Sequence, residues 1–260
     1  MKTALVTGAS SGIGEAFARE LASRKTNIIL VARSPDKLEK LATELSSTYQ
    51  VETEVIVRDL TEPAAGQAVF DAILAKGLTV DLLINNAGFG DYGAFSDRPL
   101  DKQLAMVQLN ITAVVELTGL FLPLMQQRQN GAIINVSSIA GFQPNPYMSV
   151  YAASKAFILN FSEALWAENK DLGVRILVTC PGPTESKFYD RADFPDSATG
   201  LNSMTMASAE KVVRETLAAL DKSQSTAVVG GFANQIIVNL PRLLPRDVLV
   251  NAIGKQFKNI

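Results

Sequence analysis

The sequence contains no histidine among its 260 residues. Histidine is the commonest general base near neutral pH, so its absence excludes a Ser-His-Asp triad and removes a frequent zinc ligand. Proton transfer must therefore use tyrosine, lysine, a carboxyl group or the thiol, and we expect no metal site.

Other features are scarce as well. Cys180 is the only cysteine, so no intrachain disulfide can form, and a reducing, cytoplasmic compartment is expected. The net charge is -2, without the basic surplus that binds nucleic acid. The most apolar stretch, residues 113–125, is short and contains Glu116, so we predict no transmembrane segment. An apolar run begins already at Ala4, so no signal peptide is expected either.

What is present is the composition of a compact globular protein, with 47% apolar and 19% charged residues. Short, continuously apolar runs alternate with longer amphipathic segments, which predicts a doubly wound, parallel α/β sheet. No linker divides the chain, so we predict one domain over residues 1–260, with a substrate loop or lid at 185–208. Residues 230–260 are expected to pack on the body or at an oligomer interface. The predicted strands are 3–7, 27–32, 51–57, 81–84, 132–136, 175–179 and 226–229, and the predicted helices are 13–24, 36–46, 63–75, 101–127, 150–169 and 208–220.

A glycine-rich loop, Thr-Gly-Ala-Ser-Ser-Gly-Ile-Gly, joins the first predicted strand to the first helix at residues 7–14. In that position glycines allow close backbone approach, and the free N–H groups of the helix start face the pyrophosphate of a dinucleotide. A tight turn of small residues is the alternative. The expected binding residues are Gly8, Ser10, Ser11, Gly12, Ile13 and Gly14.

The pattern Thr-Gly-x-x-x-Gly-Ile-Gly resembles the cofactor loop of the short-chain dehydrogenases/reductases. A second motif of that family, Tyr-x-x-x-Lys, stands at Tyr151 and Lys155, and the resemblance extends from residue 3 to about 190. It implies a Rossmann fold of about seven strands and hydride transfer between a nicotinamide and a carbonyl or alcohol carbon.

The end of the second strand indicates which nicotinamide is used. Ala32 stands where NAD-preferring members of the family carry Asp, and Arg33 and Ser34 follow it. A guanidinium can hold the 2′-phosphate of NADP(H), whereas a carboxylate would repel it. The sequence therefore predicts NADP(H), unless Arg33 is only a solvated surface residue.

The resemblance implies further cofactor contacts. Thr184 stands where the family commonly has Val or Ile, and Ser186 stands where Thr is usual, so either could meet the nicotinamide carboxamide. The residues implied are Asp59 and Leu60 at the adenine, Asn86, Ala87 and Gly88 beside the adenosine half, and Pro181, Gly182, Thr184 and Ser186 at the nicotinamide.

Tyr151 and Lys155 are four residues apart and therefore share one face of a helix. A nearby ammonium favours phenolate, so we expect Lys155 to lower the pKa of Tyr151 and make it a general acid and base. The resemblance makes Ser138 the residue that holds the substrate oxygen, with Ser137 as its rival. It also makes Asn110 the anchor, through its backbone, of a water that reaches Lys155.

These features together predict an NADP(H)-dependent oxidoreductase that interconverts a carbonyl and a secondary alcohol. The resemblance implies a homodimer or homotetramer. A small to medium, apolar substrate fits the aromatic residues of three variable segments, namely Phe89, Tyr92, Phe95, Phe142, Tyr147, Phe188, Tyr189 and Phe194.

Three alternative functions are weighed against the oxidoreductase. A non-catalytic NADP(H)-binding regulator would lack Ser, Tyr or Lys from the catalytic group. A nucleotide-sugar epimerase or dehydratase would be longer and have another glycine spacing, and a structural protein would need neither motif.

The apolar residues of the last segment could cover the pocket, pair with another subunit or touch a membrane surface.

Overall fold

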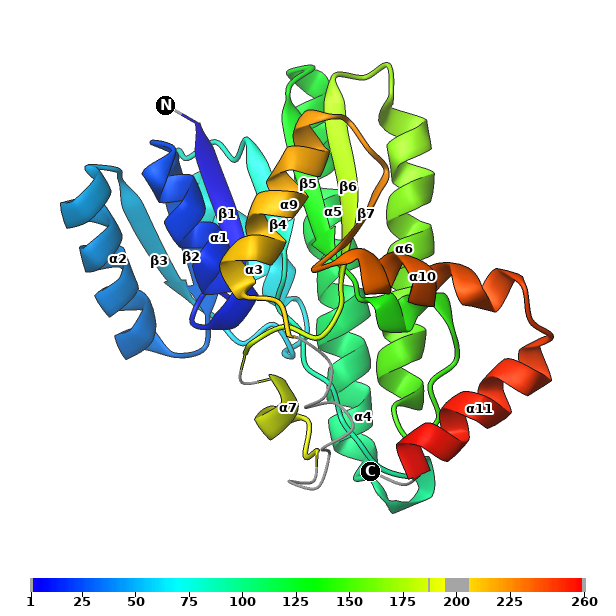
Figure 1. Ribbon diagram of the computed structural model, residues 1–260. Coiled ribbons are helices and arrows are strands. Elements are labelled where there is room, and N and C mark those ends of the chain that lie inside the picture. Colours follow the sequence, from blue (N-terminus) through cyan, green and yellow to red (C-terminus); the bar gives the residue numbers. More distant parts are fainter. Residues whose placement is uncertain (1, 187, 195–205, 259–260) are drawn as a thin grey trace.

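The computed structural model describes residues 2–186, 188–194 and 206–258, and seven strands form one parallel sheet in them (Figure 1). The strand order is β3-β2-β1-β4-β5-β6-β7, as predicted for a doubly wound fold. The strands are β1 (Thr3–Thr7), β2 (Asn27–Ala32), β3 (Thr53–Val57), β4 (Leu82–Asn85), β5 (Gly131–Val136), β6 (Val174–Pro181) and β7 (Thr226–Val229).

Helices cover both faces of the sheet, which explains why its strands are continuously apolar. Along β1, Ala4 and Val6 pack into one core cluster while Leu5 packs into the cluster on the opposite face. One face is covered by α1 (Gly12–Ser23), α2 (Pro35–Tyr49) and α9 (Ala209–Asp221), and the other by α3 (Ala65–Ala75), α5 (Ala113–Gln127) and α6 (Ser149–Asn169).

The long helix predicted at 101–127 is interrupted. It consists of α4 (Leu100–Val107), a π-helical turn at Gln108–Thr112, and α5. Wide turns of this kind shift the backbone register locally and often occur at functional sites. Here the turn places Asn110, which is buried, behind the catalytic helix α6.

The same helical run, Leu100–Gln127, is long enough for a membrane span and contains an 18-residue window with a mean hydropathy of 1.6. Its inner face nevertheless belongs to the core, because Leu117, Phe121 and Met125 pack against the sheet. Core helices often have this composition, so one such run is weak support for a span. The absence of a transmembrane segment stays a prediction.

The functional end of the sheet lies where β1 and β4 meet, since the chain winds away from this point in both directions. Short elements cover this end: η1 (Phe95–Asp97), η3 (Ile139–Phe142), α7 (Phe188–Arg191), α10 (Phe232–Asn239), η4 (Leu240–Arg242) and α11 (Arg246–Lys258). Figure 1 shows α10 and α11 forming an arm on the β7 side of the sheet. Part of the predicted lid, residues 195–205, lies outside the described residues.

Candidate active site

A cavity of about 590 Å³ opens at the carboxyl ends of the strands. It extends from the glycine loop and Arg33 to Tyr151 and the C-terminal helices. Of the predicted site residues, Gly14 and Asn110 are the two that do not line it. The other predicted residues line it: Gly8, Ser10, Ser11, Gly12, Ile13, Arg33, Ser34, Asp59, Leu60, Asn86, Ala87, Gly88, Ser138, Tyr151, Lys155, Pro181, Gly182, Thr184 and Ser186.

Two glycines of the loop, Gly8 and Gly14, leave no room for a Cβ. Gly8 has a φ of 66°, and a Cβ there would lie 2.9 Å from the Cα of Ala87. Gly14 is held inside the first turn of α1, where a Cβ would lie 2.4 Å from the carbonyl oxygen of Gly8. Ser11 precedes α1 without a side-chain cap, so the first N–H groups of the helix are not capped by it. The loop therefore fits a phosphate-bearing ligand.

Thr7 joins the glycine loop to the next segment of the site. Its hydroxyl accepts hydrogen bonds from the backbone N–H groups of Asn86 (2.9 Å) and Ala87 (3.0 Å) and donates one to the carbonyl of Ile84. The Asn86 side chain donates back to the carbonyl of Thr7 at 2.9 Å. These bonds fix the two loops that line the adenosine half of the cavity.

The end of the cavity expected to hold the adenosine half of a cofactor carries exposed basic groups. Arg33 Nη1 lies 3.4 Å from Asp59 Oδ2, and its side chain is 68% exposed. Burial raises the pKa of Asp59, but hydrogen bonds from Thr61 and the charge of Arg33 bring it below its ordinary value. Ser34 makes no cap bond to α2, so its hydroxyl is not occupied by the helix. The carboxylate thus holds Arg33 at the cavity without burying it.

Arg58 is a residue that the sequence analysis missed. It lines the same end of the cavity, and its Nε is buried without a hydrogen-bond partner. An unpaired buried donor is costly, and a ligand acceptor would satisfy it. The available signal was a basic residue directly before Asp59, at the end of a predicted strand.

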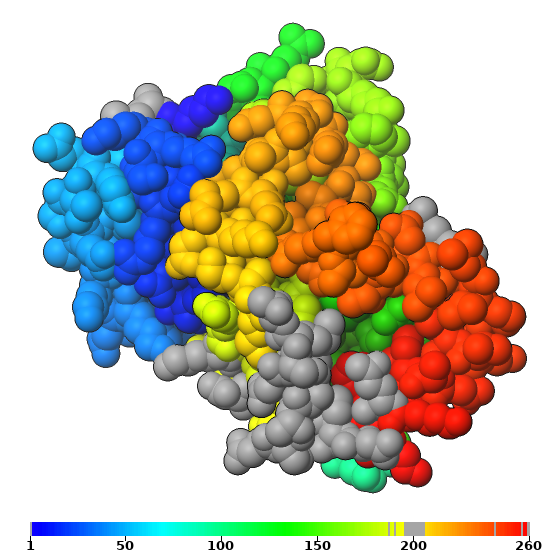
Figure 2. All heavy atoms as spheres, in the orientation of Figure 1, coloured from blue at the N-terminus to red at the C-terminus, as the bar shows by residue number. Residues whose placement is uncertain are grey.

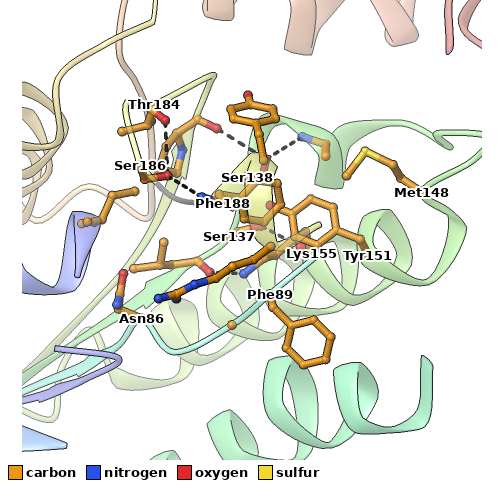
Figure 3. A pocket seen from close by; sticks show the side chains of 18 of the residues that line it. Asn86, Phe89, Ser137, Ser138, Met148, Tyr151, Lys155, Thr184, Ser186 and Phe188 are labelled. Atoms are coloured by element: carbon orange, nitrogen blue, oxygen red, sulfur yellow. Dashed lines mark hydrogen bonds between the residues drawn. The ribbon is translucent and has the colours of Figure 1, made fainter. Parts of the chain in front are cut away.

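The three side chains predicted to be catalytic, Ser138, Tyr151 and Lys155, converge at the inner end of the cavity (Figure 3). Tyr151 and Lys155 lie one turn apart on α6, with Lys155 Nζ 5.7 Å from the centre of the Tyr151 ring. Lys155 donates a hydrogen bond of 2.9 Å to the carbonyl oxygen of Val136. Both side chains are buried, yet both line the cavity, which is what acid–base chemistry in a shielded site requires.

Burial governs the acidity of both groups. It raises the pKa of Tyr151 above 10, and a hydrogen bond with Ser138 offsets part of that increase. It lowers the pKa of Lys155 from 10.5 to about 8, with Cys180 acting in the opposite direction. The predicted net lowering of the Tyr151 pKa is therefore not found in this structure. Loss of hydration dominates, and the ammonium is turned toward the backbone of β5.

The structure distinguishes Ser138 from Ser137, the alternative candidate for holding the substrate oxygen. Ser137 is buried, and its hydroxyl donates a 2.7 Å hydrogen bond to the carbonyl of Lys155, so it fastens α6 to β5. Ser138 accepts a 3.1 Å hydrogen bond from the N–H of Ala140, and the pKa of Tyr151 responds to its hydroxyl. Ser138 is thus the serine beside the phenol.

Asn110 lies behind the catalytic group. Its amide donates to the carbonyl of Phe89 (3.0 Å) and to Ser154 (3.1 Å), and its oxygen accepts from the N–H of Phe89 (3.2 Å). A Cβ on Gly88 would lie 2.9 Å from this oxygen and 3.5 Å from Lys155 Nζ, so the two groups are close neighbours. The predicted water between them stays a prediction.

The turn after β6 distinguishes its two hydroxyl residues. Thr184 is buried and donates 2.9 Å to the carbonyl of Gly182. Ser186 lies over the glycine loop, because its Cβ would be 3.2 Å from a Cβ placed on Gly12. The Ser186 hydroxyl is also engaged locally, since it donates to the carbonyl of Thr184 (3.4 Å) and accepts from the N–H of Phe188 (3.3 Å), so the two residues differ in that Ser186 lies over the glycine loop.

Both the sequence and the structure of the chain match those of known proteins. The sequence profile described as short chain dehydrogenase matches residues 2–193. The chain belongs to the short-chain dehydrogenase family. It is 42% identical over 186 residues to a very-long-chain 3-oxoacyl-CoA reductase of Anas platyrhynchos, covering 68% of this chain and 58% of that relative. The chain thus spans well under two thirds of that relative's length.

Solved structures of the family agree over nearly the whole chain. One is a 7beta-hydroxysteroid dehydrogenase studied for its stereoselectivity, with a TM-score of 0.87 and 29% identity over 97% of this chain and 96% of that one. Another is a short-chain dehydrogenase from Sphingobium yanoikuyae in complex with NADPH, with a TM-score of 0.82 and 30% identity over 100% of this chain and 96% of that one.

The remaining wall of this dehydrogenase's cavity is apolar. Phe188 of α7 lies against Tyr151, with ring centres 5.2 Å apart, and Phe89, Met148 and Phe194 line the same region. Asn145 and Gln143 add polar groups that the sequence analysis did not single out. The C-terminal segment covers this part of the cavity, through Ile237, Leu240, Leu244, Leu249, Ala252, Ile253 and Phe257.

A charge cluster ties the α7 region to the segment after β4. The Asp91 carboxylate is buried and pairs with Arg98 and with Lys102 Nζ at 2.6 Å. Asp193, next to Phe194, pairs with the same two cations. Burial raises the pKa of Asp91, but the two cations bring it below its ordinary value. The cluster thus holds the aromatic side of the cavity in place.

Proposed function

We propose that the protein is an NADP(H)-dependent oxidoreductase that interconverts a carbonyl and a secondary alcohol on an apolar substrate. The observation that carries this proposal is one continuous cavity with the glycine loop at one end and Ser138, Tyr151 and Lys155 at the other. A cofactor bound along it would bring its reactive ring beside the phenol, which is the arrangement that hydride transfer with coupled proton transfer needs.

The site fits a nicotinamide dinucleotide. The glycine loop has no room for a Cβ, and Asn86, Ala87 and Leu60 line the wall beside it. Arg33, Ser34 and Arg58 gather at the adenosine end, where a 2′-phosphate needs cationic and hydroxyl partners. Three donors at that end favour NADP(H) over NAD(H).

The bound nicotinamide supplies a hydride to the carbonyl carbon in reduction and takes one from the alcohol carbon in oxidation. Ser138 holds the substrate oxygen by a hydrogen bond, and Tyr151 gives its phenolic proton to that oxygen or accepts one from it. Lys155 stabilises the transient phenolate by its charge, which its pKa of about 8 leaves largely in place at pH 7. Phe188 and the C-terminal helices exclude water from the reacting atoms.

An apolar substrate is supported by the lining of the catalytic end. Aromatic and aliphatic side chains dominate there, and few polar groups other than the catalytic ones are present in the described lining. The relatives act, by their names, on a 3-oxoacyl-CoA and on a hydroxysteroid, both of which present a carbonyl or alcohol on a large apolar skeleton. We infer a substrate of that size and polarity.

The test is NADPH consumption with a panel of steroid ketones, 3-oxoacyl thioesters and small aldehydes. Tyr151→Phe should lower kcat by at least about 10²-fold while the Kd for NADPH, followed by fluorescence, stays within about twofold. Substantial turnover by this variant would refute the assigned role. A wild type that binds NADPH but reduces no compound would favour the regulator alternative, which the complete Ser138, Tyr151 and Lys155 group argues against.

We also propose a cytoplasmic homodimer or homotetramer. Exposed apolar side chains on α4, α5 and α6, among them Leu104, Val115 and Phe157, support a subunit interface on that face. Light scattering after size-exclusion chromatography tests it, and a monomer at micromolar concentration would contradict it.

A further inference from the structure

The C-terminal arm, defined as residues 232–258 from the start of α10 to the end of α11, exposes large apolar side chains on its outer surface. Phe232 and Leu243 are 79% and 80% exposed, and Ile236 and Val248 are more than half exposed. Phe232 and Ile236 are four residues apart on α10 and therefore share one helix face. In Figure 2 the arm forms a continuous orange-to-red surface on one side of the molecule. An exposed patch of this kind marks an interaction site.

The arm is anchored to the domain by its other face, so its outer surface has a defined orientation. Asn234 is buried and donates a 2.8 Å hydrogen bond to the carbonyl of Val229 in β7. Leu249 and Ile253 of α11 are buried against the cavity, and the hydroxyl of Tyr92 donates to the carbonyl of Phe257. Two amphipathic helices are thus fixed with their apolar outer residues directed away from the domain.

The charge of the arm is opposite to that of the whole chain. No charged residue occurs in α10, and the exposed charges of α11 are Arg246, Lys255 and Lys258 against Asp247. The chain as a whole carries a net charge of -2. Apolar side chains beside a cationic surplus match the boundary between acyl chains and anionic headgroups. A second copy of the arm would instead bring like charges together.

The patch reaches the mouth of the cavity. Leu240 and Leu244 are 45% and 38% exposed, and both also line the cavity. An apolar molecule held in a lipid layer against the arm would therefore meet the cavity wall without crossing water.

We propose that the C-terminal arm docks on an anionic lipid surface, with Phe232 and Leu243 among the side chains that enter the acyl boundary. Docking itself does not depend on catalysis; only its use, delivery of an apolar substrate into the cavity, rests on the proposed function.

The test is co-sedimentation of the full chain with vesicles of phosphatidylcholine alone and of phosphatidylcholine mixed with phosphatidylserine. The net surplus of two cations on α11 predicts roughly 30-fold tighter binding to the mixed vesicles, weakened by high salt. The double variant Phe232→Ser/Leu243→Ser should lose at least about tenfold in this binding. The matched control Leu74→Ser/Leu172→Ser, which removes two exposed leucines elsewhere, should bind like the wild type.

Both variants are checked by circular dichroism and by turnover of a water-soluble ketone, since none of the four residues lines the cavity. The proposal is overturned if the wild type does not bind mixed vesicles, or if both double variants lose binding equally. It is also overturned if Phe232→Ser/Leu243→Ser only converts a dimer to a monomer, which would make the arm a subunit interface. Vesicle binding without any turnover would leave this proposal standing and remove the proposed function instead.

Discussion

Replacing Lys155 with methionine should stabilise the folded protein while abolishing turnover. The side chain is buried, and burial lowers its pKa from 10.5 to about 8. A pKa that is lower in the folded than in the unfolded state means that protonated Lys155 opposes folding. Methionine has a similar length without the charge, so it removes this penalty and the catalytic ammonium together.

The size of the effect follows from the shift. A difference of about 2.5 pKa units corresponds to a destabilisation of about 3 kcal/mol, present in full below both pKa values and lost as pH rises from about 8 to 10.5. Methionine also loses the hydrogen bond to the carbonyl of Val136, which is worth about 1 kcal/mol. The net gain at pH 7 should therefore be about 2 kcal/mol, or roughly 4–8 °C in Tm for a chain of this size.

Urea unfolding followed by circular dichroism, without added cofactor, measures the gain. Between pH 7 and about pH 9.5 the advantage of Lys155→Met should shrink by about 2 kcal/mol, because wild-type Lys155 then sheds its proton in the folded state. Lys37→Met, at an exposed position of α2, is the matched control and should change stability by less than about 0.5 kcal/mol at both pH values. A variant less stable than wild type at pH 7, or an advantage independent of pH, would refute the reasoning.

Three further outcomes are expected. Arg33→Asp should raise the KM for NADPH by on the order of 100-fold and leave the KM for NADH nearly unchanged, because it replaces a partner of the 2′-phosphate by a repelling carboxylate. Steady-state kinetics in which both KM values change by the same factor would contradict the NADP(H) assignment. Ser138→Ala should lower kcat/KM by about 10²- to 10³-fold with unaltered NADPH binding, and full activity would remove its role. Asp91→Asn should lower the free energy of unfolding in urea by about 3 kcal/mol at pH 7, because two cations lose a buried partner. The matched variant Asp193→Asn, at an exposed carboxylate, should lower it by less than about 1 kcal/mol. The pKa of Asp91 is depressed in the folded state, so its contribution should vanish as pH falls through that pKa, and a gap that persists in acid would contradict the ion-pair explanation.

The strands were predictable because each is short, mostly apolar and flanked by turn or helix-start residues. β1, β2 and β7 have the predicted bounds, and most others differ by one or two residues. The interruption at Gln108–Thr112 was not predictable, because no turn residue marks it within the apolar helical pattern. The interruption depends on Asn110 bonding to Phe89 and Ser154, which are remote in sequence.

Most of the predicted site residues line the cavity, and they were predictable because the chemistry expected of them requires particular residue types at fixed spacing. Glycine is needed at 8 and 14, where a Cβ has no room, and is favoured at 12 by a φ of 57°, while Tyr151 and Lys155 share a helix face. Arg58 escaped notice because its role depends on a buried, unpaired Nε, which a sequence does not reveal.

The sequence by itself determined which groups can move a proton and hold a dinucleotide, because those are properties of residue types and short local patterns. Only the tertiary structure decided how acidic these groups are, since the pKa values of Tyr151 and Lys155 depend on the hydration that packing removes. It also decided that the C-terminal arm both closes the cavity and turns Phe232 and Leu243 outward, because the two faces of a helix are assigned only when it packs against a partner.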